Sequence, residues 1–249
     1  MIQSCCKADE PNAKSVQEVA CSECGLDPLC QVLDYAEQGS GVPEGVLMRR
    51  QPVQRGEMLF SLNQPFAAIY AVKSGSFKAV VTGTSGQDRV VGFFLPGDLV
   101  GAEGMANQAY SYGVRALEES SVCSLEIDRL AHTGRSTEVL QEALITMLGQ
   151  EVALNHMVTS SLIQQNAEQR LAAFILSIAK RSSIRGFSQP YLGLSMSRSD
   201  IASYLGLARE TVSRVLTRFQ NTGLIGLRKH AVKVLDPEAL ERVSALRQP

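Results

Sequence analysis

The sequence predicts an α+β protein: an N-terminal antiparallel β-roll or jelly roll, then a long helix, then a C-terminal winged helix-turn-helix domain. Three observations predict this fold. Glycines separate short β-branched runs between residues 52 and 128, a stretch without proline runs from about 136 to 179, and residues 197–217 show a helix-turn-helix pattern. A chain of 249 residues with 45% hydrophobic content is long enough to bury two cores.

The expected segments follow from these changes in residue pattern along the chain. We predict an N-terminal segment with a cysteine motif at 1–50, the β-roll at 51–130, the long helix at 136–165 and the winged domain at 166–249. The longest nearly apolar run, LAAFILSIA at 171–179, is too short to cross a membrane. We therefore expect a cytoplasmic protein that does not associate with a membrane.

The first segment carries CSECGLDPLC, which places Cys21, Cys24 and Cys30 within ten residues. In a reducing compartment, such cysteines indicate metal binding or redox chemistry rather than disulfides. A tetrahedral zinc ion or an iron-sulfur cluster needs four protein ligands, so a fourth partner is expected elsewhere in the chain.

The β-roll segment supplies the one further cysteine in a structured stretch, Cys123 in SSVCSLEID. It alternates with Leu125 and Ile127, which places it on the apolar face of a strand. A lone cysteine there is usually an inert core residue. Three thiols without a fourth partner favour Cys123 as the missing ligand.

The strands of the roll are predicted from apolar runs bounded by glycine. These runs are FAAIYAVKSG, SFKAVVTG, DRVVGFFLPGD and SVCSLEID. TGTSGQ, between the second and third runs, is typical of a hairpin turn. Short antiparallel strands at this spacing indicate a small barrel or jelly roll.

The long helix carries an apolar repeat that indicates a dimer seam. The spacing alternates between three and four residues, as in a coiled coil, so this helix is predicted to pair with its copy in a second subunit. A helix that packs on its own β-roll would show the same periodicity. The predicted seam residues are Ile145, Leu148, Val152, Asn155, Thr159 and Leu162.

The helix-turn-helix pattern begins at Ser197, which forms a predicted capping box with Asp200. Gly206 ends the first helix where a tight turn needs positive φ. Ala202 is small enough for the two helices to cross closely. The apolar contacts between the helices are predicted at Ile201, Leu205, Leu207, Val212 and Val215.

In this motif the second helix enters the major groove of DNA. Arg214 can donate two hydrogen bonds to a guanine, and Glu210 can accept from the exocyclic amine of a cytosine or adenine. Arg209 and Arg218 are predicted to contact phosphates. LIGLRKHAVKVLD then reads as a hairpin whose tip, with Arg228 and Lys229, lies on the DNA backbone as a wing.

The charge distribution agrees with this assignment. Residues 1–165 carry 11 Lys and Arg against 19 Asp and Glu, whereas residues 166–249 carry 13 against 6. The net charge is therefore −8 in the first part and +7 in the second. A basic C-terminal third is a candidate for contact with nucleic acid, although a solvated basic face would have the same composition.

These motifs together resemble the fumarate and nitrate reduction regulators (FNR), a family within the cyclic AMP receptor protein superfamily. The resemblance covers nearly the whole chain. It rests on CSECGLDPLC, on SSVCSLEI, on NAEQRLAAFILSIAKRSSIRGFS at 166–188 and on LGLARETVSRVLTRFQNTGLI at 205–225.

The resemblance implies an oxygen-responsive transcription regulator. It implies that Cys21, Cys24, Cys30 and Cys123 bind a 4Fe-4S cluster, and that oxygen degrades the cluster and converts a homodimer to monomers. It also implies that the dimer binds an inverted repeat in double-stranded DNA and contacts RNA polymerase, with the TGTSGQ turn as a candidate contact. Half-sites like TTGAT would be read by Glu210, Ser213 and Arg214.

Two positions separate this chain from relatives in the superfamily. Cyclic AMP binders carry an Arg-Ser pair before a Val-Arg-Ala-like stretch, but Tyr110-Ser111 stands here before Gly113–Ala116. A phosphate-pairing arginine is missing, so no cyclic nucleotide is expected. The family more often has aspartate where this chain has Asn155, so we expect this protein to dimerise more readily without its cluster.

Two alternatives remain. A structural zinc ion on the same four cysteines would fit a DNA-binding regulator equally well. An iron-sulfur electron-transfer protein would explain the cysteines but not the helix-turn-helix. An enzyme is not expected, because the sequence shows no nucleophile–base pairing, phosphate loop or metal–histidine spacing.

Overall fold

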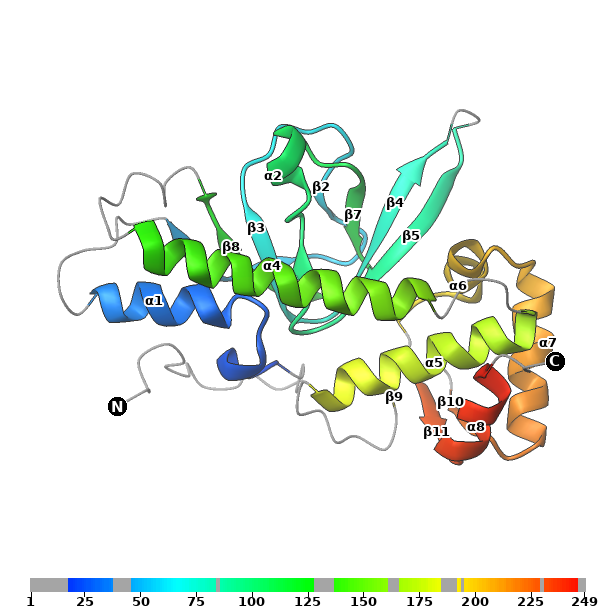
Figure 1. The fold of residues 1–249 in the computed structure, drawn as a ribbon. Helices are drawn as coiled ribbons and strands as arrows, with labels where there is room; N and C mark the ends of the chain where they lie inside the picture. Colours follow the sequence, from blue (N-terminus) through cyan, green and yellow to red (C-terminus); the bar gives the residue numbers. More distant parts are fainter. Residues whose placement is uncertain are drawn as a thin grey trace. The chain divides into compact units, whose positions relative to one another are not determined.

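The computed structural model describes residues 18–37, 46–83, 86–127, 137–160, 166–184, 192–193, 195–228 and 231–245. Its contacts divide the chain into two compact units (Figure 1). The first unit comprises Met1–Phe77 and Phe94–Val152, and the second comprises Lys78–Phe93 and Ala153–Pro249. None of the described helices is long and apolar enough to cross a membrane.

The first unit is a β-roll built on an antiparallel sheet of four strands in the order β1-β8-β3-β6. A second antiparallel pair joins β2 to β7. The strands are β1 (Leu47–Val53), β2 (Met58–Phe60), β3 (Ile69–Ser74), β6 (Leu99–Val100), β7 (Gly113–Ala116) and β8 (Ser120–Leu125). Alternating apolar residues from both sheets share one core, formed by Val53, Phe60, Val72, Phe77, Val100, Tyr110, Val114, Ala116 and Val122.

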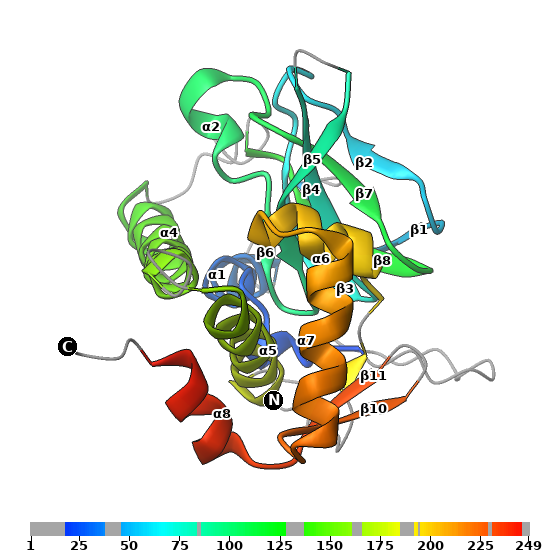
Figure 2. The same cartoon turned by 90° about the vertical axis from the view of Figure 1, so that its right-hand side faces the viewer.

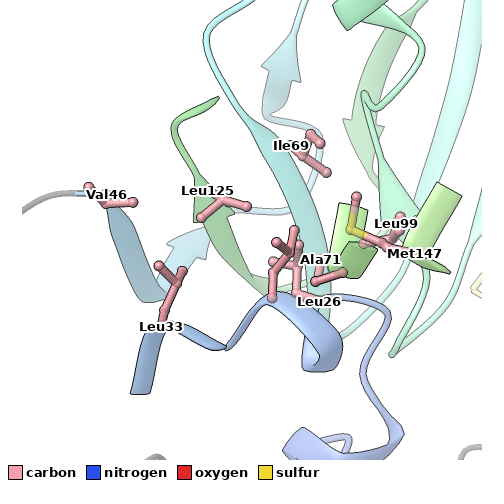
Figure 3. Packing of buried hydrophobic residues seen from close by; sticks show 10 residues of the cluster. Leu26, Leu33, Val46, Ile69, Ala71, Leu99, Leu125 and Met147 are labelled. Atoms are coloured by element: carbon pink, nitrogen blue, oxygen red, sulfur yellow. The ribbon is translucent and has the colours of Figure 1, made fainter. Parts of the chain in front are cut away.

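A second apolar core lies between the four-stranded sheet and the helices of this unit. Helix α1 (Asp27–Glu37) contributes Leu29 and Leu33, and α4 (Thr137–Ser160) contributes Ala143 and Met147. Both helices lie side by side in Figures 1 and 2. Figure 3 shows Leu26 and Leu33 among side chains from the strands, including Ile69, Ala71, Leu99 and Leu125. A four-residue helix, α2 (Gly104–Asn107), completes the unit.

The second unit contains the winged helix-turn-helix domain (Figure 2). Its helices are α5 (Ala167–Ile184), α6 (Arg198–Leu205), α7 (Arg209–Asn221) and α8 (Pro237–Ser244). The strands β9 (Leu192–Gly193), β10 (Ile225–Arg228) and β11 (Ala231–Val234) form an antiparallel sheet in the order β10-β11-β9. Asp236 caps the start of α8, with Pro237 at its first position.

A hairpin of β4 (Phe77–Thr82) and β5 (Asp88–Phe94) also belongs to the second unit, which includes Lys78–Phe93. The Lys78 ammonium lies 2.6 Å from Oδ1 of Asp200 at the start of α6. The backbone N–H of Val90 donates to the Ser203 hydroxyl at 3.0 Å. An aromatic cluster closes this contact, formed by Phe93, Phe174 and Tyr204.

The predicted α+β class and its order of β-roll, long helix and winged domain are confirmed. The stretch without proline from about 136 to 179 holds two helices: α4 lies within the helix predicted at 136–165, and α5 lies within the winged domain predicted at 166–249. Helix α5 begins after its own cap, because the Gln169 N–H donates to Asn166 Oδ1 and the Asn166 N–H donates to Gln169 Oε1. Helix α1, which begins inside the cysteine motif, is an element that the sequence pattern does not predict.

Candidate functional site

The four predicted ligand cysteines line one cavity of the first unit. Cys21 begins the short 3-10 helix η1 (Cys21–Glu23), Cys24 follows it, Cys30 lies near the start of α1, and Cys123 lies on β8. All four have intermediate exposure, and none of them forms a disulfide. The cavity is completed by Leu26, Leu47, Arg49, Arg50 and Lys73.

The cysteine segment is fixed to the roll by backbone contacts on either side of Cys21. The Val19 N–H donates to the Lys73 carbonyl at 3.0 Å, and the Gly25 N–H donates to the Gly97 carbonyl at 2.9 Å. A Cβ atom on Gly25 would lie 2.7 Å from Leu99 Cγ and 3.0 Å from the Gly97 oxygen. Gly25 is therefore required for this close approach.

A β-bulge in β1 brings two cationic residues to the same cavity. The β1–β8 register runs from Met48 opposite Ser124 to Gln51 opposite Val122, so Arg49 and Arg50 together oppose Cys123. Arg50 has φ of 51°, in the left-handed region that arginine rarely adopts. Its guanidinium forms an ion pair with Glu18 at 3.2 Å.

Burial is the main influence on the thiol of Cys24. Burial raises the pKa of the Cys24 thiol to about 11. Cys123 and Cys21 raise it further, whereas a backbone hydrogen bond from Leu26 and the charge of Lys73 oppose the rise. Without a metal, this thiol is therefore protonated at neutral pH, and metal binding must release its proton.

The donor set fits a metal group that prefers thiolates. Four cysteines with apolar surroundings and nearby cations suit zinc or an iron-sulfur cluster, because both bind thiolate sulfur. Within the described ranges, no three Cys, His, Asp or Glu side chains converge closely enough to hold a single ion. The chemistry of the ligands alone leaves the choice between the two groups open.

The cations of this site, Arg49, Arg50 and Lys73, were not among the site residues predicted from the sequence. Lys73 interrupts the apolar strand run IYAVKSG, and that interruption is a signal that could have revealed it. Arg49 and Arg50 showed no such signal, because their approach to Cys123 depends on the bulge.

The helix-turn-helix has the geometry that its sequence predicts. Ser197 and Asp200 form a reciprocal capping box at α6, and Gly206 has φ of 64° at its end. Ile201, Ala202 and Leu205 of α6 are buried. Val212 and Val215 of α7 are buried too, whereas Leu207 is half-buried.

The predicted DNA-reading side chains lie on the open face of α7. Arg209, Glu210 and Arg214 are exposed, and Ser213 is half-buried. Arg218 is also exposed, but its guanidinium pairs with Glu168 of α5, and both residues line a groove with Arg214. Arg228, at the end of β10, is exposed, whereas Lys229 lies outside the described residues.

The predicted dimer seam is partly open to solvent in the single chain. The Ile145 side chain is 71% exposed and that of Val152 is 54% exposed. Leu148 is half-buried against the core that holds Met147. Asn155 and Thr159 lie on α4 but their side chains are not described, and Leu162 lies outside the described residues. Val139, which is 50% exposed, is an additional apolar residue on the helix.

Aromatic side chains fill part of the interior of the roll. The Tyr110 ring is buried and stacks on Phe60 with ring centroids 3.7 Å apart. Its hydroxyl donates to the Ala68 carbonyl at 2.8 Å and accepts from the Ala68 N–H at 3.1 Å. Tyr110 thus has a structural role in the core of the roll.

Comparisons with known proteins agree with this architecture. Two family models match the chain: the cyclic nucleotide-binding domain at residues 50–134 and the Crp-like helix-turn-helix domain at residues 169–243. The solved structure of FixK2 from Bradyrhizobium japonicum has a TM-score of 0.69 at 24% identity, and the match covers 80% of this chain and 98% of FixK2. The fold and its helix-turn-helix therefore define a DNA-binding transcription regulator of the Crp type.

Two curated relatives specify the family. The chain is 34% identical over 229 residues to the transcriptional activator protein Anr of Pseudomonas aeruginosa, covering 92% of this chain and 94% of Anr. It is 31% identical over 231 residues to the fumarate and nitrate reduction regulatory protein of Yersinia pestis, covering 93% and 92%. The chain belongs to the FNR/Anr family of transcription regulators, which are not enzymes.

Proposed function

We propose that this protein is an oxygen-responsive regulator that holds a 4Fe-4S cluster on Cys21, Cys24, Cys30 and Cys123. The observation that carries the proposal is the single cavity lined by all four thiols, which come from two segments far apart in the sequence. When bound, the cluster supplies a group that oxygen attacks and degrades. Relatives named as anaerobic regulatory proteins support this role.

The chain's own residues connect the cysteine cavity to the dimer helix. Leu26, between Cys24 and Cys30, shares one apolar core with Leu29 of α1 and with Ala143 and Met147 of α4. A change in how the cysteine segment packs therefore changes the apolar contacts that hold α4 against the first unit. Packed cores transmit such shifts because their side chains have few alternative arrangements.

The outer face of α4 is the proposed homodimer contact. Ile145 and Val152 leave apolar area exposed that a second copy of the helix would cover. An amide and a hydroxyl follow at Asn155 and Thr159, so the seam is weak and responsive to small changes in α4. Because Asn155 carries no charge, it does not repel its copy in the partner.

The dimer presents two copies of α7 to an inverted repeat of double-stranded DNA. Arg214 and Glu210 read base edges near the start of the helix, together with Ser213, in a half-site like TTGAT. Arg209, Arg218, Arg228 and Lys229 contact phosphates. As a monomer, the protein would lose half of these contacts and leave the site at physiological salt.

The names of the relatives support a role in activation. Anr and FnrA are named as transcriptional activators, so we infer that this protein contacts RNA polymerase in the cytoplasm. The hairpin turn between β4 and β5 is a candidate surface, although residues 84 and 85 of this turn lie outside the described residues.

Metal analysis after anaerobic purification tests the proposal. Iron and acid-labile sulfide in equal amounts, with broad visible absorption, would support the cluster. A colourless protein with one zinc ion per chain would instead establish the structural zinc alternative. Titration against an inverted-repeat duplex separates both regulators from an electron-transfer protein, which would not distinguish this duplex from a random one.

A further inference from the structure

Lys73 is a buried cation that faces the cysteine cavity. It lies in the interior of β3 with 5% of its surface exposed, and it lines the cavity with the four thiols. Its ammonium donates to the Val19 carbonyl and lies 3.8 Å from Cys21 Sγ. Both contacts come from the segment that carries the cysteine motif.

Burial makes this charge costly unless an anion lies close to it. A buried ammonium loses its hydration and needs charge-assisted partners to offset the loss. Arg50 has such a partner in Glu18, at 3.2 Å. Among the residues that the structure describes, no carboxylate lies within ion-pair distance of Lys73. The thiols that share its cavity are the groups that become anionic when they bind a metal.

We propose that Lys73 is the built-in counter-ion of the four-cysteine site. This inference rests on the proposed function, because it requires that the cysteines bind a metal cluster as thiolates. In the loaded protein, the ammonium offsets part of the negative charge that four thiolates bring. It also holds the Val19 end of the segment against β3, so that charge balance and ligand position depend on the same side chain.

Two substitutions separate the charge from the hydrogen bond. Lys73→Gln keeps donor groups for the Val19 carbonyl but removes the charge, whereas Lys73→Arg keeps the charge. Arg55→Gln removes a cation from the exposed β1–β2 turn and serves as the matched control. For each variant, iron release to a chelator is timed without oxygen, and the reduction potential and the unfolding of the metal-free protein are measured.

We expect Lys73→Gln to release iron roughly 10–100-fold faster than the wild type, as is usual when a supporting residue of a metal site is lost. Its reduction potential should shift to a more negative value, because the more negative reduced state loses a nearby cation. Lys73→Arg should stay within a few-fold of the wild type, and Arg55→Gln should match it. The metal-free Lys73→Gln protein should unfold at the same denaturant concentration as the metal-free wild type, or higher.

Equal iron release and equal potential in Lys73→Gln and the wild type would overturn the inference. So would faster release that is matched by an equal loss of stability in the metal-free protein, because that result would mean a purely structural role. If Lys73→Gln fails to fold, Lys73→Met, of similar length and apolar, takes its place under the same criteria. A wild-type protein that holds no iron would overturn the proposed cluster itself, and this inference with it.

Discussion

Cys123 pairs with Ala71 across the β3–β8 ladder, so the roll fixes its backbone independently of the N-terminal segment. Ala71 is fully buried in the same core as Leu26, which lies between Cys24 and Cys30. The cavity therefore combines one cysteine on a strand of the sheet with three cysteines on a segment that packs against the sheet. A site of this kind assembles only when the segment packs on the sheet.

The first prediction concerns the ligand on the strand. Cys123→Ser should abolish iron binding while the roll stays folded, because serine is isosteric but a poor ligand for iron. Iron content and the thermal unfolding midpoint of the same sample check this. Cys5→Ser and Cys6→Ser, at positions outside the described residues, are the controls and should keep full iron. Full iron in Cys123→Ser would remove it from the ligand set.

The second prediction concerns the docking of the cysteine segment. Gly25→Ala places a Cβ 2.7 Å from Leu99 Cγ, so the segment must shift away from the sheet. We expect a loss of about 1–3 kcal/mol in the stability of the metal-free protein and a clear fall in iron content. Gly92→Ala is the matched control, because its Cβ would meet only the Ala79 side chain, at 3.7 Å. Equal iron content in the two variants would contradict the prediction.

The third prediction concerns the face of α4. Ile145→Glu should prevent dimerisation with little change in the stability of the monomer, because the Ile145 side chain is 71% exposed in the single chain. Sedimentation of the anaerobic protein measures the dimer fraction. Val91→Glu changes an exposed valine on β5 and should leave the dimer intact. A normal dimer in Ile145→Glu would place the interface elsewhere.

The fourth prediction concerns base reading by α7. Arg214→Ala should cost about 1–3 kcal/mol on the inverted repeat and relax selectivity at the guanine. Arg228→Ala should weaken binding to all duplexes alike and flatten the salt dependence, because a phosphate contact carries no sequence information. Titrations of both variants on specific and random duplexes compare the two effects. If Arg214→Ala lost equal affinity on both duplexes, its assignment to a base would be wrong.

The fifth prediction concerns the ion pair between Lys78 and Asp200. Burial alone would raise the pKa of Asp200, but hydrogen bonds from Lys78 and Ser197 outweigh burial and lower it from its ordinary value of 3.8. The pair therefore stabilises the fold above the unfolded pKa, and its contribution is lost as pH falls through the folded value. Lys78→Met should cost about 1 kcal/mol at pH 7, and the difference should shrink as the pH falls below 3.8 through the lowered pKa of Asp200. A difference that does not change with pH would show that the ion pair is not its source.

Local features of the chain were predictable because they depend on neighbouring residues. The capping box at Ser197 and the left-handed Gly206 follow from spacing alone, and both are present. The strand that carries Cys123 also follows from its alternation with Leu125. The boundary predicted between 165 and 166 lies next to the start of α5, where Asn166 and Gln169 form a reciprocal capping box.

Features that depend on distant segments could not be predicted. Lys73 faces Cys21 because a backbone hydrogen bond joins Val19 to β3, a pairing that no local pattern encodes. The approach of Arg49 to the cavity likewise depends on a bulge that only the strand register reveals. The cysteine ligands could be predicted from the sequence because of their residue type and spacing. The cations around them could be identified only from the structure.

We propose that the cluster on the four cysteines controls DNA binding. Stepwise addition of oxygen to the anaerobic protein tests this, with visible absorbance, retained iron and affinity for an inverted-repeat duplex recorded on each sample. Absorbance, iron and affinity should fall together over the same oxygen range. Full affinity for the duplex after the iron is gone would contradict it.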